Sequence, residues 1–227
     1  MRALDVFNDY VAWLRDNVPL AYENLAGPAR PRQLAMLERA IGRPLPAEVA
    51  AVLSVHNGQI DSAVGDYDHG VPCIPTLVFM STREIRRTWQ LWDSVKDNPA
   101  TQSLQSSGMV YPAAQGKIKP LYSSPGWIPL WSDPTRPDYI GLDFDPGPAG
   151  TPGQIINFGR NEECHHLCAP TYTDLLEFLL AEVTSGAWPA TEIVEDDDDR
   201  DPLPWFGEPR SSFFNALHDR FEPQRRD

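Results

Sequence analysis

The sequence has few cysteines and no long apolar run. Its three cysteines, Cys73, Cys164 and Cys168, are an odd number without a paired pattern, which argues against the disulfide framework of a secreted protein. No apolar stretch approaches the roughly 20 residues that a membrane-spanning helix requires. Asp5 and Asp9 interrupt the N-terminal segment where a signal peptide would have an apolar core. We therefore expect a cytoplasmic protein that does not bind a membrane.

Positively charged residues are also scarce. The 227-residue chain has 19 lysines and arginines against 32 aspartates and glutamates, and its formal net charge at pH 7 is −13. Such a surface repels phosphate backbones, so we expect no direct binding to nucleic acid. Residues 192–201 contain seven acids and one arginine, so this run carries −6 and the rest of the chain carries −7. A protein that is acidic throughout can meet a basic partner quickly through electrostatic steering.

The spacing of apolar residues divides the chain into helices, then strands, then one closing helix. The predicted helices cover residues 4–18, 34–41, 46–58, 81–98 and 171–186. Ser81 and Glu84 have the spacing of a capping box, and Thr173 is the expected cap of the closing helix. Short β-rich segments between residues 117 and 169 predict a meander of antiparallel strands. The fold class expected is therefore α+β, with the meander sheet packed against the N-terminal helices and the closing helix.

The domain organisation expected from the sequence is simple. Residues 1–186 should form a single domain, because a chain of 227 residues suggests one good-sized domain or one domain with appendages. Residues 187–227 should form an acidic linker followed by a short aromatic C-terminal segment. In that segment, Phe213, Phe214 and Leu217 have the spacing of a short amphipathic helix.

The segment YIGLDFDPGPAGTPGQII, residues 139–156, raises the question of a metal or an acid/base site. If Asp143 and Asp145 occupied the first and third positions of a calcium loop, Pro148 would stand where the loop needs glycine. Gln154 would stand where it needs a bidentate glutamate. An acid/base role for the two aspartates has no second predicted partner nearby. We therefore favour a turn between two strands, held by these aspartates.

The segment EECHHLCAP, residues 162–170, contains four side chains of types that bind zinc: Cys164, His165, His166 and Cys168. The usual spacing of paired zinc ligands is absent, and no second cluster could close a tetrahedral site. A strand with small buried cysteines is the favoured interpretation. No Gly-x-Ser-x-Gly nucleophile motif is present either. We expect no metal, no cofactor and no catalytic residue.

The order of three segments resembles the SUKH superfamily. The first is LERAIGRPLPAEVAAVLSVHNGQ, and the second is WIPLWSDPTRPDYIGLDFDPGPAGTPGQIINF. The third, TYTDLLEFLLAEV, resembles the final helix of that superfamily. The resemblance covers roughly residues 34–186 and is carried by residues that we expect to form the fold. They are Leu45, Pro46, Asn57, Gly58, Trp127, Pro129, Asp143, Asp145, Gly150, Gly153 and Gln154.

The resemblance implies a mixed α+β domain without catalytic activity. The superfamily includes bacterial immunity proteins, which bind a cognate toxin that is often a nuclease, and fungal regulators of cell-wall glucan synthesis. The acidic charge favours the hypothesis of an immunity protein that neutralises a basic protein toxin. An intracellular regulatory scaffold that binds endogenous proteins is the alternative, and a hydrolase or metal enzyme is a third hypothesis. The expected partner-binding residues are Asp61, Asp66, Asp68, Glu192, Glu195, Asp196, Asp197, Asp198, Asp199 and Asp201.

Overall fold

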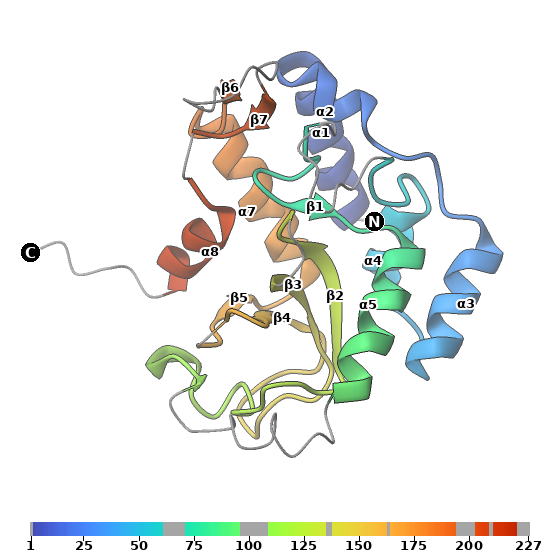
Figure 1. Ribbon diagram of the computed structural model, residues 1–227, viewed down its shortest axis with the longest axis vertical. Coiled ribbons are helices and arrows are strands. Elements are labelled where there is room, and N and C mark those ends of the chain that lie inside the picture. Colours follow the sequence, from blue (N-terminus) through green and yellow to red (C-terminus); the bar gives the residue numbers. More distant parts are fainter. Residues whose placement is uncertain are drawn as a thin grey trace, which may run out of the picture.

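The computed structural model places most of the chain. The described residues are 2–60, 71–95, 109–134, 138–162, 164–193, 203–208 and 211–221. They contain both helices and strands, as Figure 1 shows. None of their helices is both long enough and apolar enough to span a bilayer.

Four helices open the chain. They are α1 (Arg2–Asn17), α2 (Pro19–Glu23), α3 (Pro31–Ile41) and α4 (Ala47–Leu53). Proline occupies the first turn of α2 and α3, where its missing N–H costs nothing. Gly42 ends α3 with a φ of 70°, a left-handed conformation that glycine adopts without strain.

The third predicted helix is shorter than the sequence indicated. Helix α4 stops at Leu53, before Asn57 and Gly58, which were expected to end it. The Asn57 side chain instead accepts a hydrogen bond of 2.9 Å from the N–H of Thr82, at the start of the next long helix. Gly58 has a φ of 76°, and a Cβ there would lie 2.4 Å from the backbone nitrogen of Ser81. This close approach of two backbone segments requires glycine.

The sheet has five strands in the order β1-β2-β3-β4-β5, and all neighbours are antiparallel. The strands are β1 (Val78–Phe79), β2 (Trp127–Ser132), β3 (Asp138–Asp143), β4 (Gln154–Gly159) and β5 (Leu167–Ala169). This meander and the helices around it confirm the α+β prediction. One predicted strand is wrong: residues 117–122 form no strand, and Ile118 makes an isolated bridge with Gln115. A short 3₁₀ helix, η2 (Pro112–Ala114), precedes that bridge.

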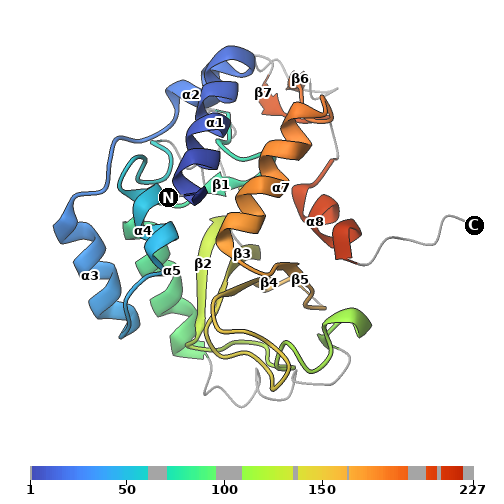
Figure 2. The same ribbon diagram turned by 180° about the vertical axis from the view of Figure 1, so that it is seen from behind.

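Helices α7 (Tyr172–Thr184) and α5 (Thr82–Val95) also pack around the sheet. Helix α7 contacts α1, and the pair lies in front of the sheet in Figure 2. Helix α5 packs against β2 on one side and α3 on the other. The predicted capping box is present, because the Glu84 carboxylate accepts hydrogen bonds of 2.8 Å from the N–H and the hydroxyl of Ser81. The predicted cap of α7 is wrong: Thr171 accepts from the N–H of Asp174, whereas the Thr173 hydroxyl donates to Glu48 on α4.

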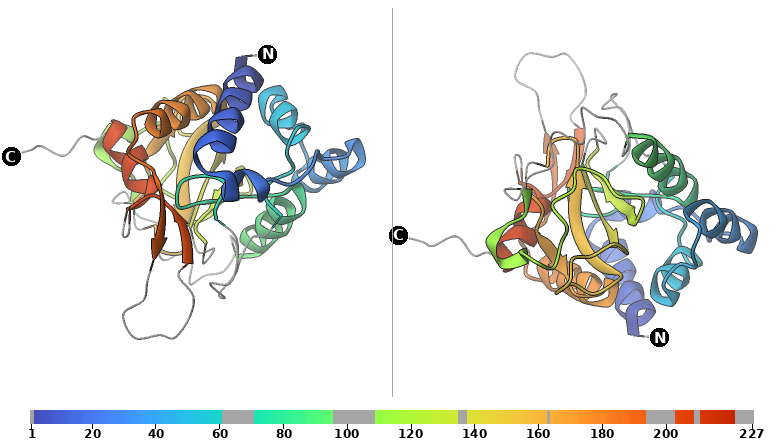
Figure 3. Two further views of the ribbon diagram at one scale, coloured as in Figure 1. Left: turned by 90° about the horizontal axis from the view of Figure 1, so that it is seen from above. Right: turned by 90° about the horizontal axis from the view of Figure 1, so that it is seen from below.

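The C-terminal part contains a two-stranded hairpin and a last helix. Strands β6 (Ala190–Ile193) and β7 (Leu203–Phe206) pair antiparallel, and α8 (Phe213–Phe221) follows where a short helix was predicted. Figure 3 shows the hairpin beside α1. Trp188, Phe206, Phe213 and Leu217 are all buried in the same hydrophobic core as α1 and α7. The boundary at Gly186 stays a prediction, but the described residues beyond it share one core with those before it.

Candidate binding surfaces

Asp143 lies at the end of β3 and is completely buried. Its Oδ1 accepts hydrogen bonds from Trp127 Nε1 at 3.1 Å and from the Asp145 N–H at 2.8 Å, and its Oδ2 accepts from Gln154 Nε2 at 2.9 Å. Burial raises the pKa of the Asp143 carboxyl, and these hydrogen bonds oppose that rise. The carboxylate therefore connects the ends of three adjacent strands.

The neighbouring aspartate is partly exposed and has different contacts. Asp145 forms an ion pair with Lys119 and accepts a hydrogen bond of 3.0 Å from the Ser124 hydroxyl. The Gln154 amide also donates to the Lys117 carbonyl at 2.9 Å. These contacts tie the loop before β2 to the turn between β3 and β4. The fold-forming role of both aspartates stays a prediction, and substitution can test it.

The Cys/His segment lies around the start of β5. Cys168 is buried within β5, and burial raises the pKa of its thiol. The two ring nitrogens of His166 are buried without a hydrogen-bond partner in the part of the chain that the structure describes, and burial lowers the pKa of His166 to about 3. The His166 ring packs against the rings of His218 and Tyr111, with centroid distances of 5.3 and 6.0 Å. Within the described ranges, no three His, Cys, Asp or Glu side chains are arranged to hold a metal ion.

The adjacent histidine, His165, contacts the backbone of two segments. Both ring nitrogens of His165 lie near carbonyl oxygens, that of Asn157 at 3.1 Å and that of Leu121 at 2.8 Å. Burial lowers the pKa of His165, although these two carbonyls oppose the shift. The imidazole thus joins β4 to the loop that precedes β2.

The expected partner-binding residues fall mostly outside the part of the chain that the structure describes. The residues outside it are Asp61, Asp66, Asp68, Glu195, Asp196, Asp197, Asp198, Asp199 and Asp201. Glu192 is described and exposed, and it lies in β6 at the edge of a groove. The structure therefore describes one of the ten expected partner-binding residues, Glu192.

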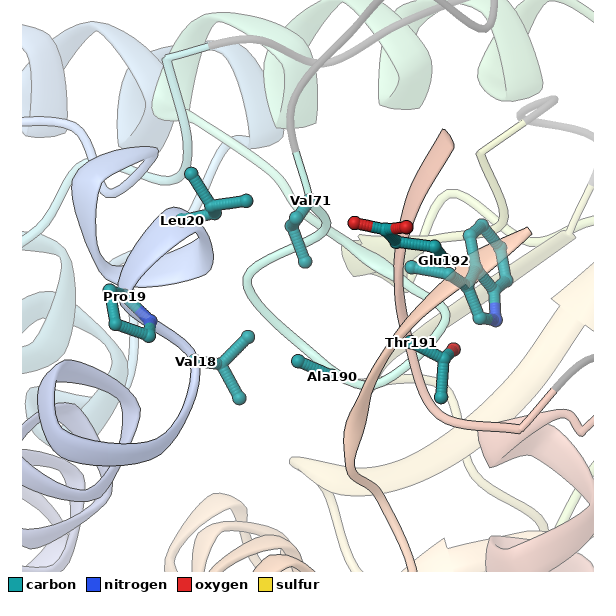
Figure 4. A pocket seen from close by; sticks show the side chains of 8 residues that line it. Val18, Pro19, Leu20, Val71, Ala190, Thr191 and Glu192 are labelled. Atoms are coloured by element: carbon teal, nitrogen blue, oxygen red, sulfur yellow. The ribbon is translucent and has the colours of Figure 1, made fainter. Parts of the chain in front are cut away.

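The groove beside Glu192, which we call the hairpin groove, has a volume of about 360 Å³. Figure 4 shows that Val18, Pro19 and Leu20 approach it from one side and that the β6 residues Ala190–Glu192 approach it from the other. Trp205 of β7 also lines it, and its buried indole N–H has no hydrogen-bond partner among the described residues. The hairpin groove is mainly apolar, with the Glu192 carboxylate at its edge.

A larger groove of about 870 Å³ runs along α5, and we call it the α5 groove. Arg83, Arg87 and Leu91 line it from the helix, and Ile60 and Tyr139 line it from a loop and from β3. It combines exposed cationic and apolar side chains, the two kinds of group that bind a protein segment through charge and through burial. The sequence-based reasoning missed this surface because it sought partners for the acidic runs. The available signal was the pair of arginines one helical turn apart.

Comparison with known proteins identifies the family. The family model of the SMI1 / KNR4 family (SUKH-1) matches residues 28–179. The chain is 29% identical over 209 residues to "Cell wall biosynthesis/cell cycle regulator smi1" of Schizosaccharomyces pombe, covering 88% of this chain and 39% of that protein. It is 25% identical over 240 residues to "Glucan synthesis regulatory protein" of Neurospora crassa, covering 92% of this chain and 43% of that protein. It is also 24% identical over 212 residues to "Cell wall assembly regulator SMI1" of Saccharomyces cerevisiae, covering 82% of this chain and 41% of that protein.

These relatives correct the predicted function. They are fungal proteins named as regulators, so the prediction of an immunity protein with a basic toxin as its partner is wrong. The error arose because the net charge of −13 was interpreted as an adaptation to a basic partner. The chain spans about two fifths of the length of these relatives. The superfamily resemblance is confirmed: the chain belongs to the SMI1 / KNR4 family (SUKH-1).

Proposed function

We propose that the chain is the protein-binding part of a regulator of cell-wall glucan synthesis. The observation that carries this proposal is the set of fungal relatives, whose names describe regulation of cell-wall biosynthesis, glucan synthesis and cell-wall assembly. The relatives are named as regulators and not as enzymes, which supports action by binding. The two grooves beside α5 and the β6–β7 hairpin are the surfaces that binding could use.

The proposed regulator acts in the cytoplasm. Cys73 and Cys168 are buried free thiols, which fits a reducing compartment. A fluorescent fusion expressed in fission yeast tests this: diffuse cytoplasmic signal is expected, and exclusive signal in secretory membranes would contradict it. The acidic residues around Glu192 stay a proposed docking segment for an endogenous partner.

The proposed function is tested by replacement in fission yeast. In cells that lack the smi1 relative, a hybrid is expressed in which this chain replaces the matched region of that relative. We expect the hybrid to restore incorporation of labelled glucose into wall glucan, because the matched region covers 88% of this chain. The relative with its matched region deleted is the negative control. A stable hybrid that restores no more glucan synthesis than this control would refute the proposal.

A further inference from the structure

One face of α5 is exposed along almost the whole helix. Arg83, Arg87, Leu91 and Ser94 are exposed, and each is about one turn from the next, whereas Ile85 on the opposite face is buried. The face between Arg83 and Leu91 spans eight residues, or about 12 Å at 1.5 Å per residue. A segment of about four extended residues covers that length.

Among the described residues, the two arginines in the first half of this face have no ion-pair partner. Neither Arg83 nor Arg87 forms a salt bridge within the described part of the chain. Glu84, the acid between them in sequence, accepts hydrogen bonds from the N–H and the hydroxyl of Ser81 at the start of the helix. Distant acids are screened beyond a Debye length of about 8 Å at physiological ionic strength. Arg83, Glu84 and Arg87 line the groove together, so these three side chains give it a local net charge of +1, although the whole chain is acidic.

Exposed apolar side chains lie at both ends of the arginine pair. Ile60 is 69% exposed and Leu91 is 64% exposed, the two largest exposures among the described large apolar side chains. Ile60 adjoins the start of α5, since the preceding residue, Gln59, donates its N–H to the Phe79 carbonyl at 2.9 Å. Leu91 lies near the other end, on the same groove as Tyr139. Large apolar groups left exposed in one groove are typical of a binding surface.

The helix that carries this surface is fixed in place. Trp89 donates its indole N–H to the Pro125 carbonyl at 2.9 Å, and the Trp92 ring contacts the Tyr139 ring at a centroid distance of 6.0 Å. The buried Ile85 anchors the helix to the core, and α3 packs along it. Because the helix is already ordered, binding of a partner costs little free energy for ordering it.

We propose that the α5 groove binds a short segment of a partner protein in which adjacent carboxylates are flanked by apolar side chains. This inference rests on the proposed function and names the kind of partner segment. The carboxylates would pair with Arg83 and Arg87, because a guanidinium offers two parallel donors to a carboxylate. The flanking apolar side chains would cover Ile60 and Leu91. The charge complementarity lies in the middle of the groove and the apolar contacts lie at its ends.

The probe that tests this proposal is a fluorescein-labelled synthetic peptide with the core Leu-Asp-Glu-Asp-Leu between glycines. Fluorescence anisotropy with the full chain should show saturable binding that weakens as salt concentration rises. The same peptide with Asn-Gln-Asn in place of the acids should bind at least about tenfold more weakly, because it lacks the charge-assisted hydrogen bonds. Absence of saturable binding by the acidic peptide would overturn the proposal.

Variants of the chain locate the binding. Arg83→Gln/Arg87→Gln should weaken binding of the acidic peptide by at least about tenfold, and Leu91→Ser by about fivefold. The matched control is Arg2→Gln/Arg15→Gln, which removes two exposed charges from α1, and its affinity should equal that of the unaltered chain. All five substituted positions are exposed, so circular dichroism should show unchanged folding. Equal affinity of the α5 variant and the control would overturn the proposal.

Two other occupants of the groove give distinct results. If a second copy of the chain covers the face, analytical ultracentrifugation will show a dimer that Leu91→Ser dissociates. If the chain's own acidic residues occupy it, the peptide will bind only after Asp61, Asp66 and Asp68 are changed to asparagine. Either result would overturn the proposal.

The fission-yeast hybrid separates this inference from the proposed function. If Arg83→Gln/Arg87→Gln abolishes peptide binding but the hybrid still restores glucan synthesis, the α5 groove does not serve this function and the inference fails alone. If the hybrid without substitutions fails while the peptide binds, the function fails and the binding site stands. The expected result is that the α5 variant binds the peptide at least about tenfold more weakly and restores less glucan synthesis, whereas the α1 control retains both activities.

Discussion

At the scale of single residues, three donors depend on the buried Asp143 carboxylate: Trp127 Nε1, the Asp145 N–H and Gln154 Nε2. Replacing Asp143 by alanine removes the acceptor of the Trp127 and Asp145 N–H groups, whereas Gln154 Nε2 keeps the Lys117 carbonyl as an acceptor. We expect the free energy of unfolding to fall by about 2 kcal/mol or more, since each unsatisfied buried group costs about 1–3 kcal/mol. Urea denaturation followed by tryptophan fluorescence measures the change.

The matched control is Asp145→Ala. Its carboxylate is partly exposed and pairs with Lys119, so its removal should cost no more than about 1 kcal/mol. If Asp143→Ala were as mild as this control, the carboxylate would not hold the ends of the strands together.

Glu162, between β4 and β5, should make the stability of the fold depend on pH. Burial, with a contribution from Asp138, raises its pKa to about 7, against an ordinary value of 4.5. Between these two values the folded state binds this proton more tightly than the unfolded state does. The free energy of unfolding contributed by Glu162 therefore falls as pH rises from about 4.5 to 7, by up to about 3 kcal/mol.

The test is Glu162→Gln, whose neutral amide does not titrate. The variant should match the unaltered chain near pH 4.5 and exceed its stability near pH 7.5. His166, with its pKa lowered to about 3, acts in the opposite direction, because stability is lost as pH falls below about 6.5. Parallel curves for the variant and the unaltered chain between pH 4.5 and 7.5 would show that Glu162 does not titrate in this range.

At the scale of elements, the β6–β7 hairpin is held by an aromatic contact with the first helix. The Phe206 ring stacks on the Trp13 ring at a centroid distance of 5.9 Å, and Phe206 is completely buried. Phe206→Ala should lower the free energy of unfolding by about 3–5 kcal/mol, the usual cost of truncating a buried phenylalanine. Differential scanning calorimetry would show the lower Tm.

Leu20→Ala is the control for this change, because Leu20 is 56% exposed and lines the hairpin groove opposite β6. Its effect should stay within about 0.5 kcal/mol. A loss below about 1 kcal/mol for Phe206→Ala would mean that the hairpin packs only weakly.

The elements differ in how well the sequence predicts them. Helices with long periodic patterns were predictable, because one apolar stripe every three to four residues is a local signal. The hairpin was not, because its strands have four residues each and the acidic run 194–201 separates them. The predicted cap of α7 was two residues from the actual one. Thr171 and Thr173 both suit a cap, but the Thr173 hydroxyl donates a hydrogen bond to Glu48 of α4. The α5 groove was missed because exposure of Ile60 and Leu91 depends on contacts between elements.

At the scale of the whole molecule, the core continues past the predicted domain boundary at Gly186. Trp188, Phe206, Phe213 and Leu217 are each less than a tenth exposed. A chain of residues 1–186 lacks all four side chains. Burial of each contributes about 1.5–3 kcal/mol of stability, so the truncated chain loses roughly 6 kcal/mol or more. That loss equals much of the about 5–15 kcal/mol that stabilises a typical domain.

We therefore expect residues 1–186 to lack a cooperative unfolding transition, whereas a chain ending at Phe221 should unfold like the full chain. Calorimetry and the dispersion of amide proton signals in NMR spectra measure the difference. A cooperative transition in residues 1–186 within a few degrees of the full chain would instead support an independent domain with an appended segment.

Both edge strands of the five-stranded sheet are short. The edge strand β1 has two residues and the edge strand β5 has three, and α8 packs against β5. Such short edges offer few free backbone groups, so another chain gains little by adding a strand of its own. At this five-stranded sheet, the proposed binding of a partner should therefore depend on the partner's side chains rather than on its backbone, and single side-chain substitutions in the partner should alter its affinity.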